Sequence, residues 1–204
     1  MDQITVTVGS KVKKARRIYE LAAIYLFIAH VGWIFEKLGR LIVYKSLADR
    51  GFLSLPLCPI YATAAVGAYL LFGTPSHMRI LGKRIRGGRI KGVLLYFAAS
   101  FILASSIELC IGAFFGEIVG LPLWNYSERA FNLFGYVCLA YSFLWGALMT
   151  LFMLTMWLRL ELAVRRIGSK TLFRFCLCSY ILIAADLAFN VIYMAMSGSH
   201  FEFL

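Results

Sequence analysis

Five long apolar stretches constrain the fold more than any other feature of this sequence. They cover residues 18–44, 56–73, 92–120, 133–157 and 172–196. Most are long enough to cross a hydrocarbon core of roughly 30 Å at about 1.5 Å per helical residue. Such spans must be helical, because lipid offers no hydrogen-bond partner to an open backbone. We therefore predict an all-α bundle of five transmembrane helices that forms a single membrane domain over residues 1–204.

The composition of the chain agrees with this class. Hydrophobic residues make up 61% of the sequence and charged residues only 15%, whereas soluble domains are nearer half apolar and a quarter charged. A chain this apolar could not cover its own surface with polar groups, which excludes a water-soluble globular enzyme. The second stretch is the shortest and opens with Pro56 and Pro59, which a first helical turn tolerates.

The positive charges indicate how the chain is oriented. The chain has 21 Lys and Arg against 10 Asp and Glu. Sixteen of these cations fall in three segments, residues 11–17, 79–91 and 159–174. With five spans all three segments lie on one side, so the positive-inside rule predicts a cytoplasmic N-terminus and an external C-terminus. We expect the 79–91 segment to face anionic lipid heads rather than nucleic acid, since it lacks the spacing of a phosphate-binding loop.

Several polar side chains interrupt the apolar stretches. Glu36 and Arg40 share the first stretch, Glu108 lies in the third, and Asp186 and Asn190 lie in the fifth. A charge at mid-bilayer costs about 2.5–3.5 kcal/mol on insertion scales and usually faces the bundle interior or a wet cavity. In the predicted orientation these groups gather in the outer half of the membrane. They predict either an outward-facing pocket or a structural network that holds the helices in register.

The sequence offers little support for catalysis or metal binding. No catalytic motif and no ATPase motif is present, the histidines do not cluster, and we expect no cofactor and no metal site. Cys58 and Cys138 both fall near the predicted outer face, where they form either a disulfide or two separate thiols. Gly112 and Gly116 have the spacing that lets a neighbouring helix approach closely.

Three ordered motifs resemble a known family. They are GWIFEKL (residues 32–38), DRGFLSLPLCPIY (residues 49–61) and LWNYSERAFNLFGYVCLAYSFLWG (residues 123–146). Their order and composition are similar to those of bacterial membrane proteins described as type IV ABC transporter permeases. The resemblance covers residues 32–146 and implies a multi-pass protein of the bacterial inner membrane that takes part in transport. Asp49 and Asn125 stand where the family shows Asn and Asp, which changes the charge of any cation site inferred from the family.

The resemblance and the intramembrane polar groups together define the predicted site. The predicted pocket is formed by Glu36, Arg40, Arg50, Glu108, Trp124, Tyr126, Asn132, Asp186 and Asn190. The predicted structural positions are Gly51, Pro56, Cys58, Pro59, Tyr61, Gly112 and Gly116. A permease of this kind implies a separate ATPase or other membrane subunit as a partner, and five spans imply association of several copies around a pathway.

Three functions remain open at this stage. The first is a transport component whose carboxylates hold a cation or a proton. The second is a membrane enzyme that acts on lipid or envelope precursors at the outer leaflet, with paired carboxylates as acid and base. The third is an accessory subunit in which the polar groups only join helices.

Overall fold

The computed structural model describes residues 2–45, 52–85 and 87–197. The chain is all-α, as predicted, apart from two short hairpins. Its contacts group it into two compact units, Met1–Ala62 with Leu160–Leu204, and Thr63–Arg159. Each unit is described by itself below.

The helices follow the apolar stretches closely at four of the five positions. The element α1 covers Asp2–Tyr44, α3 covers Arg89–Ala113 and continues as the π-helical turn η2 (Phe114–Val119), and α6 covers Ser169–Ser197. The fourth stretch forms α4 (Leu139–Thr155), followed by α5 (Trp157–Arg165). The second stretch forms only α2 (Pro59–Phe72), whose 14 residues reach about 21 Å, short of a full crossing.

Helix length gives a smaller number of candidate spans than the apolar pattern does. Among the described residues, three helical segments are long and apolar enough to cross a membrane, Lys13–Ile42, Arg89–Val119 and Ser169–Ser197. The pair α4 and α5 adds a fourth if it counts as one span bent by 46°. The predicted count of five is not confirmed by this measure, because α2 is too short.

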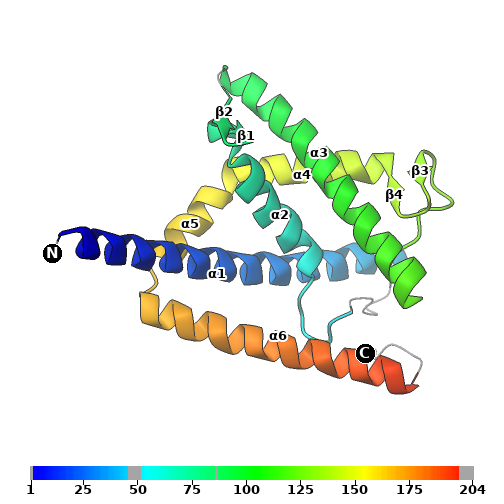
Figure 1. The fold of residues 1–204 in the computed structure, drawn as a ribbon. Coiled ribbons are helices and arrows are strands. Elements are labelled where there is room, and N and C mark those ends of the chain that lie inside the picture. Colours follow the sequence, from blue (N-terminus) through cyan, green and yellow to red (C-terminus); the bar gives the residue numbers. More distant parts are fainter. Residues whose placement is uncertain (1, 46–51, 86, 198–204) are drawn as a thin grey trace. The chain divides into compact units, whose positions relative to one another are not determined.

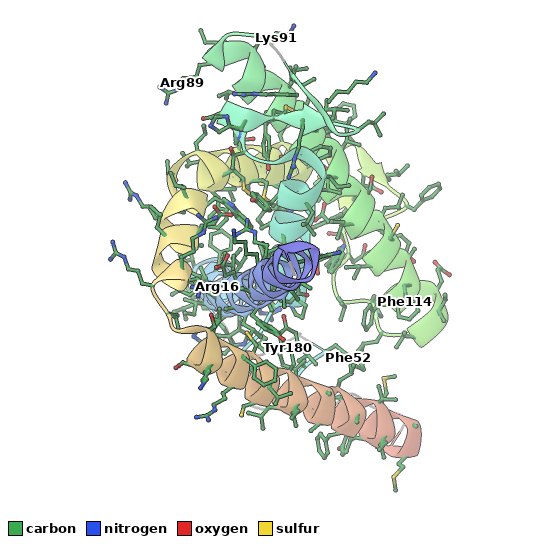
Figure 2. The ribbon with its side chains drawn as sticks, turned by 60° about the vertical axis from the view of Figure 1, so that its left-hand side comes forward. Arg16, Phe52, Arg89, Lys91, Phe114 and Tyr180 are labelled. Carbon is green, nitrogen blue, oxygen red and sulfur yellow. The ribbon has the colours of Figure 1, made fainter. Side chains whose placement is uncertain are left out.

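In the first unit, α1 and α6 lie side by side and run in the same direction (Figure 1). Residues that are later in α1 contact residues that are later in α6, as expected for a parallel pair. The Arg16 guanidinium donates to Ser169 Oγ at 2.7 Å, and the Tyr180 hydroxyl donates to the Ala22 carbonyl oxygen at 3.3 Å. Figure 2 shows Tyr180 on the side of α6 that faces α1. Parallel neighbours enter the membrane from the same side, which constrains the topology below.

In the second unit, α4 runs back along α3. Ser105 of α3 donates to Ser142 Oγ of α4 at 2.8 Å. A Cβ built on Gly146, further along α4, would lie 3.1 Å from Cβ of Phe101, which is earlier in α3. The two helices therefore form an antiparallel pair with close backbone approach at Gly146.

Two short hairpins lie at opposite ends of α3 (Figure 1). The hairpin of β1 (Arg79–Ile80) and β2 (Lys83–Arg84) follows the single 3₁₀ turn η1 (Pro75–His77) and precedes α3. The hairpin of β3 (Asn132–Leu133) and β4 (Val137–Cys138) precedes α4. The predicted fourth span thus begins at Leu139 rather than at residue 133, because residues 133–138 form this hairpin.

Candidate functional site

A non-helical segment, residues 52–58, is held against α1 in the first unit. The Cys58 amide donates to the Ala29 carbonyl oxygen at 2.8 Å, and His30 Nδ1 lies 3.0 Å from the Pro56 carbonyl oxygen. Ala29 and His30 are close to the middle of the apolar helix Lys13–Ile42. The segment is therefore fixed at the middle of a helix that is long enough to span the membrane.

The two prolines explain why this segment is not helical. A proline disfavours the helical backbone for the residue before it, which here applies to Leu55 and Cys58. Pro59 is then the first residue of α2, where its missing N–H costs nothing because that group would have no intrahelical partner. The helix of the second apolar stretch therefore begins at Pro59, one turn after Pro56, and the bounds of the second span stay a prediction.

Two polar side chains of α6 hold the same segment from the other side. The Leu55 amide donates to Asp186 Oδ2 at 3.3 Å. Asn190, only 1% exposed, contacts the Ser54 hydroxyl with Nδ2 at 3.0 Å and donates to the Asp186 carbonyl oxygen at 2.9 Å. Asp186 and Asn190 therefore meet, as predicted from their spacing, and their partner is the backbone and side chain of residues 54–55.

Glu36 of α1 contacts the first turn of α2, which directly follows the segment 52–58. The Tyr61 hydroxyl donates to Glu36 Oε1. A Cβ built on Gly32 would lie 2.7 Å from the Tyr61 ring, so Gly32 allows that ring to lie against α1. Lys37 stands over the Trp33 ring, 5.5 Å from its centroid, and Arg40 is half-buried one turn after Glu36. Glu36 itself is exposed in this unit.

In the second unit, Glu108 is a buried carboxyl group in a spanning helix. It is 7% exposed, and Trp145 Nε1 of α4 donates to its Oε1 at 3.0 Å. The Tyr126 hydroxyl also donates to this carboxyl group. Its other oxygen, Oε2, has no hydrogen-bond partner among the described residues. Glu108 is thus surrounded by donors, and its second oxygen remains available within this part of the chain.

The loop between α3 and α4 is built by the residues that carry the third motif. Asn132 Nδ2 donates to the Arg129 carbonyl oxygen at 2.8 Å, and Asn132 Oδ1 accepts from the Gly135 amide at 3.0 Å. Trp124 Nε1 donates to the Tyr136 carbonyl oxygen at 2.8 Å. The Tyr126 ring stacks on Tyr141 at 4.9 Å. Among the polar groups of this loop, Asn132 and Trp124 stabilise its backbone, whereas Tyr126 reaches Glu108.

The glycine pair of α3 accommodates an aromatic ring rather than a neighbouring helix. A Cβ built on Gly112 would lie 3.0 Å from Tyr136 Cβ, and one on Gly116 would lie 2.7 Å from Tyr136 Oη. The Tyr136 hydroxyl donates to Glu117. This hydrogen bond, followed by desolvation and by the negative charge of Glu117, raises the pKa of the Tyr136 phenol above its ordinary value. The glycines therefore allow the loop between α3 and α4 to pack on α3.

One ionic cluster was missed by the sequence analysis. Glu20 and Glu161 are buried, at 6% and 8% exposure. Arg17 binds both of them, and Arg16 binds Glu20 at 3.0 Å. Arg165 lies 3.8 Å from Glu20 and 3.9 Å from Glu161. Arg16 and Glu20 are four residues apart, a spacing that indicates an ion pair on one face of a helix. The cations of this segment were interpreted only as markers of membrane orientation.

Arg16 also completes the end of a helix in this cluster. Its Nη2 donates to the carbonyl oxygens of Arg165 and Ile167, at 2.8 and 3.3 Å. These groups belong to the last residue of α5 and the turn that follows, where carbonyls lack intrahelical partners. Figure 2 shows Arg16 beside the start of α6. The cluster therefore ties α1 to the turn between α5 and α6.

The structure brings together only some of the predicted pocket residues. Asp186, Asn190 and residues 54–55 form one group, Glu36 and Tyr61 a second, and Glu108 with Tyr126 a third in the other unit. That Glu36, Glu108 and Asp186 converge stays a prediction. Arg50 and Gly51 lie outside the described residues. Neither Cys58 nor Cys138 takes part in a disulfide in the part of the chain that the structure describes, and no three His, Cys, Asp or Glu groups gather as metal ligands within the described ranges.

These elements define an integral membrane protein of several apolar helices with polar groups placed inside them. A family model supplies the more particular assignment. The family described as "Putative ABC-transporter type IV" matches residues 23–191, and the chain belongs to this family. The resemblance inferred from residues 32–146 is confirmed. No curated protein and no solved structure matches the chain.

Proposed function

We propose that this chain is the membrane component of an ABC-type transport system, with a polar pocket in the outer half of the bilayer. The family assignment supports an ABC-transporter-related membrane protein. The carboxylates of Glu36, Glu108 and Asp186 line the proposed pocket and hold a cation or a proton.

The observation that carries the proposal is the non-helical segment 52–58 at mid-depth of α1. Non-helical backbone at membrane depth is tolerated only where protein buries it or where it lines a water-filled cavity. Interrupted helices near the bilayer midplane form the binding sites of many secondary transporters. Here the segment meets Asp186, which is just past the middle of the span Ser169–Ser197. An acid and an interrupted span thus coincide at one depth.

The interrupted span also accounts for the short α2. In the proposed topology, residues 52–58 enter from the outer side as bent, non-helical chain that is at mid-depth where it meets Ala29 and Asp186. From there α2 continues to the inner surface. Its 14 residues rise about 21 Å, which exceeds the roughly 15 Å from the middle of a hydrocarbon core of about 30 Å to its edge.

The directions of the helices support an odd number of spans. Because α1 and α6 are parallel neighbours, the chain between them must cross the membrane an odd number of times. The antiparallel pair of α3 and α4 supplies two crossings, so α2 must supply the third. This argument favours five spans over four.

The charges then select five spans over three. With α1, α3 and α6 as the only spans, the 79–91 segment would lie on the side opposite residues 11–17. With five spans, residues 11–17, 79–91 and 159–174 share one side, which the positive-inside rule makes cytoplasmic. In that orientation Glu36, Glu108 and Asp186 each lie beyond the middle of their spans, toward the outside.

Energy for transport would come from a separate subunit. An ATPase subunit would dock on the cytoplasmic segment 159–174, and copies of this chain would associate around the pathway. The ionic cluster of Arg16, Arg17, Glu20, Glu161 and Arg165 lies in or next to this segment. It would give the docking surface a fixed geometry.

The native thiol of Cys58 offers a direct test of the pocket. Cys58 is half-buried and takes part in no disulfide among the described residues, and it ends the segment 52–58. We expect a charged, membrane-impermeant methanethiosulfonate reagent to label Cys58 from the outside of intact spheroplasts, because a water-filled pocket lets the charged reagent reach the thiol. Cys176, buried between α1 and α6, is the matched control and should stay unlabelled. A Cys58 that reacts only with lipid-permeant maleimides would contradict the pocket.

A second test separates a transport site from structural glue. Glu36→Gln and Glu108→Gln should abolish transport while the folded protein remains in the membrane. The measurement compares metabolites accumulated by cells that carry each variant, by mass spectrometry, with protein level and thermal unfolding as controls. Normal accumulation in both variants would contradict a transport role for these carboxylates. A fall in unfolding temperature without a change in accumulation would favour the accessory-subunit alternative.

A further inference from the structure

The β1–β2 hairpin and the first turn of α3 form a strongly basic surface. Its exposed cations in the described residues are Arg79, Lys83, Arg84, Arg89 and Lys91. The sequence of residues 79–91 contains no acidic residue. Figure 2 shows Arg89 and Lys91 pointing away from the helices. Among the described residues, the side-chain contact of these cations is to a histidine rather than to a carboxylate, since Arg84 Nη2 lies 3.0 Å from His77 Nδ1.

The tip of this hairpin carries an exposed apolar side chain at a position where a small polar residue would have a lower free energy. Leu81 is 96% exposed and has a φ of 50°, followed by Gly82 with a φ of 77°. Left-handed backbone is uncommon for residues other than Gly, Asn and Asp, and it is strained for bulky side chains. Ile90, at the start of α3, is also 77% exposed. The surface thus combines cations with exposed aliphatic side chains.

The base of the hairpin is fixed to the start of a spanning helix. The Tyr96 hydroxyl of α3 donates to the Gly73 carbonyl oxygen at 3.1 Å, and a Cβ on Gly92 would lie 2.7 Å from the Pro75 carbonyl oxygen. Met78 is buried, and the Ile85 amide donates to its carbonyl oxygen at 2.9 Å. Two-residue strands extend only about 7 Å from this base. The headgroup layer on each side of a bilayer is of similar depth, so the tip stays within it.

We propose that this hairpin docks on anionic lipid headgroups and inserts Leu81 between them. Cations attract an anionic leaflet, and a short apolar side chain at headgroup level gains from contact with acyl chains. The occupant is a lipid surface rather than a protein or a nucleic acid, because the fixed base keeps the tip at the membrane. The docking would brace the end of α3 against one leaflet, whatever the transport substrate is.

Limited trypsin cleavage tests this docking with the native sequence. The full chain is placed in nanodiscs of phosphatidylcholine, with or without phosphatidylglycerol, so that both faces are accessible. Cleavage after Arg79, Lys83 and Arg84 is measured by mass spectrometry relative to cleavage after Arg166, which lies in the exposed turn after α5. We expect this ratio to be at least about fivefold lower in anionic discs and to recover at high salt. Equal ratios in the two discs would overturn the proposal.

Two variants test the insertion of the side chain. Leu81→Asp and Leu81→Gly both suit the left-handed backbone, so the hairpin keeps its conformation, and both should raise the cleavage ratio in anionic discs. The matched control is Phe131→Asp, because Phe131 is also exposed (83%) and left-handed (φ 54°) at the other hairpin of this unit. It should leave the ratio unchanged. Full protection of Leu81→Asp and Leu81→Gly in anionic discs would overturn the insertion of Leu81.

Discussion

The carboxylate of Asp186 accepts a hydrogen bond from the backbone amide of Leu55 at 3.3 Å. An acid in the middle of a spanning helix therefore holds a stretch of non-helical chain, in addition to any ligand. Removing this acceptor would leave the backbone amide of Leu55 without its side-chain partner. The following variants separate the shape of this side chain from its charge.

Asp186→Leu should destabilise the protein by about 0.5–1.5 kcal/mol, the net contribution of one hydrogen bond, because Leu55 and Asp186 are only half-buried. Asp186→Asn keeps an oxygen acceptor and should cost less than half as much. Thermal unfolding in one detergent measures both. An Asp186→Leu protein as stable as the native chain would show that the contact with Leu55 does not stabilise the fold.

Gly116→Ala should disturb the loop between α3 and α4, because the new Cβ would lie 2.7 Å from Tyr136 Oη. Alanine otherwise favours a helix by about 1 kcal/mol over glycine, so a loss of stability would come from Tyr136. Gly67→Ala is the control, since nothing lies within 4 Å of a Cβ there. Adding Tyr136→Ala to Gly116→Ala should remove most of the difference. The measurement is a double-mutant cycle by thermal unfolding.

The hydrogen bond from Tyr136 to Glu117 should be visible in a pH titration. The pKa of the Tyr136 phenol is raised in the folded chain. The stabilisation that this hydrogen bond gives the folded chain is therefore fully present below the ordinary pKa of tyrosine. It is lost as the pH rises through the raised pKa. The absorbance at 295 nm of the native protein minus that of Tyr136→Phe reports the tyrosinate of Tyr136. This tyrosinate should appear at higher pH in the native protein than in the same comparison made with Glu117→Gln. Identical titration curves with and without Glu117 would contradict this.

Glu20→Gln should destabilise the first unit more than Glu128→Gln, a change at an exposed loop acid. Arg17 and Arg165 would then keep only the carboxylate of Glu161 among the contacts described, and Arg16 would lose the carboxylate of Glu20. We expect a loss of about 1–3 kcal/mol, below the value for fully buried pairs because Arg165 is half exposed. Combining Glu20→Gln with Arg165→Gln should recover part of it. Equal unfolding temperatures for Glu20→Gln and Glu128→Gln would mean that solvent screens the cluster.

Hydrophobic patterning predicted the helical class and the approximate place of four helices. It failed at residues 52–58, because apolar side chains and prolines are compatible with both a helix and an extended segment. The deciding partners, Asp186 and Asn190, lie about 130 positions later in the sequence. No local pattern could connect them with Ser54 and Leu55.

The candidate site was predicted in its residue types more than in their roles. Asp186, Asn190 and Glu108 are polar groups within apolar helices, and each has a hydrogen-bond partner in the structure, whereas their role in a pocket stays a prediction. Trp124 and Asn132 instead stabilise the loop that contains them. A motif alone does not distinguish residues that bind a substrate from residues that shape a loop, since both require a particular side chain at a particular place.

The ionic cluster at the start of α1 has a consequence for biosynthesis. Arg17 and its partner Glu161 are 144 positions apart. Arg16 is separated from its carbonyl partners after α5 by a similar length of chain. At about 5–20 residues per second, a ribosome needs roughly 7–30 s to deliver that partner. During this interval Glu20 is the nearby carboxylate for Arg16 and Arg17. The cluster is therefore complete only after α5 and the start of α6 have been synthesised.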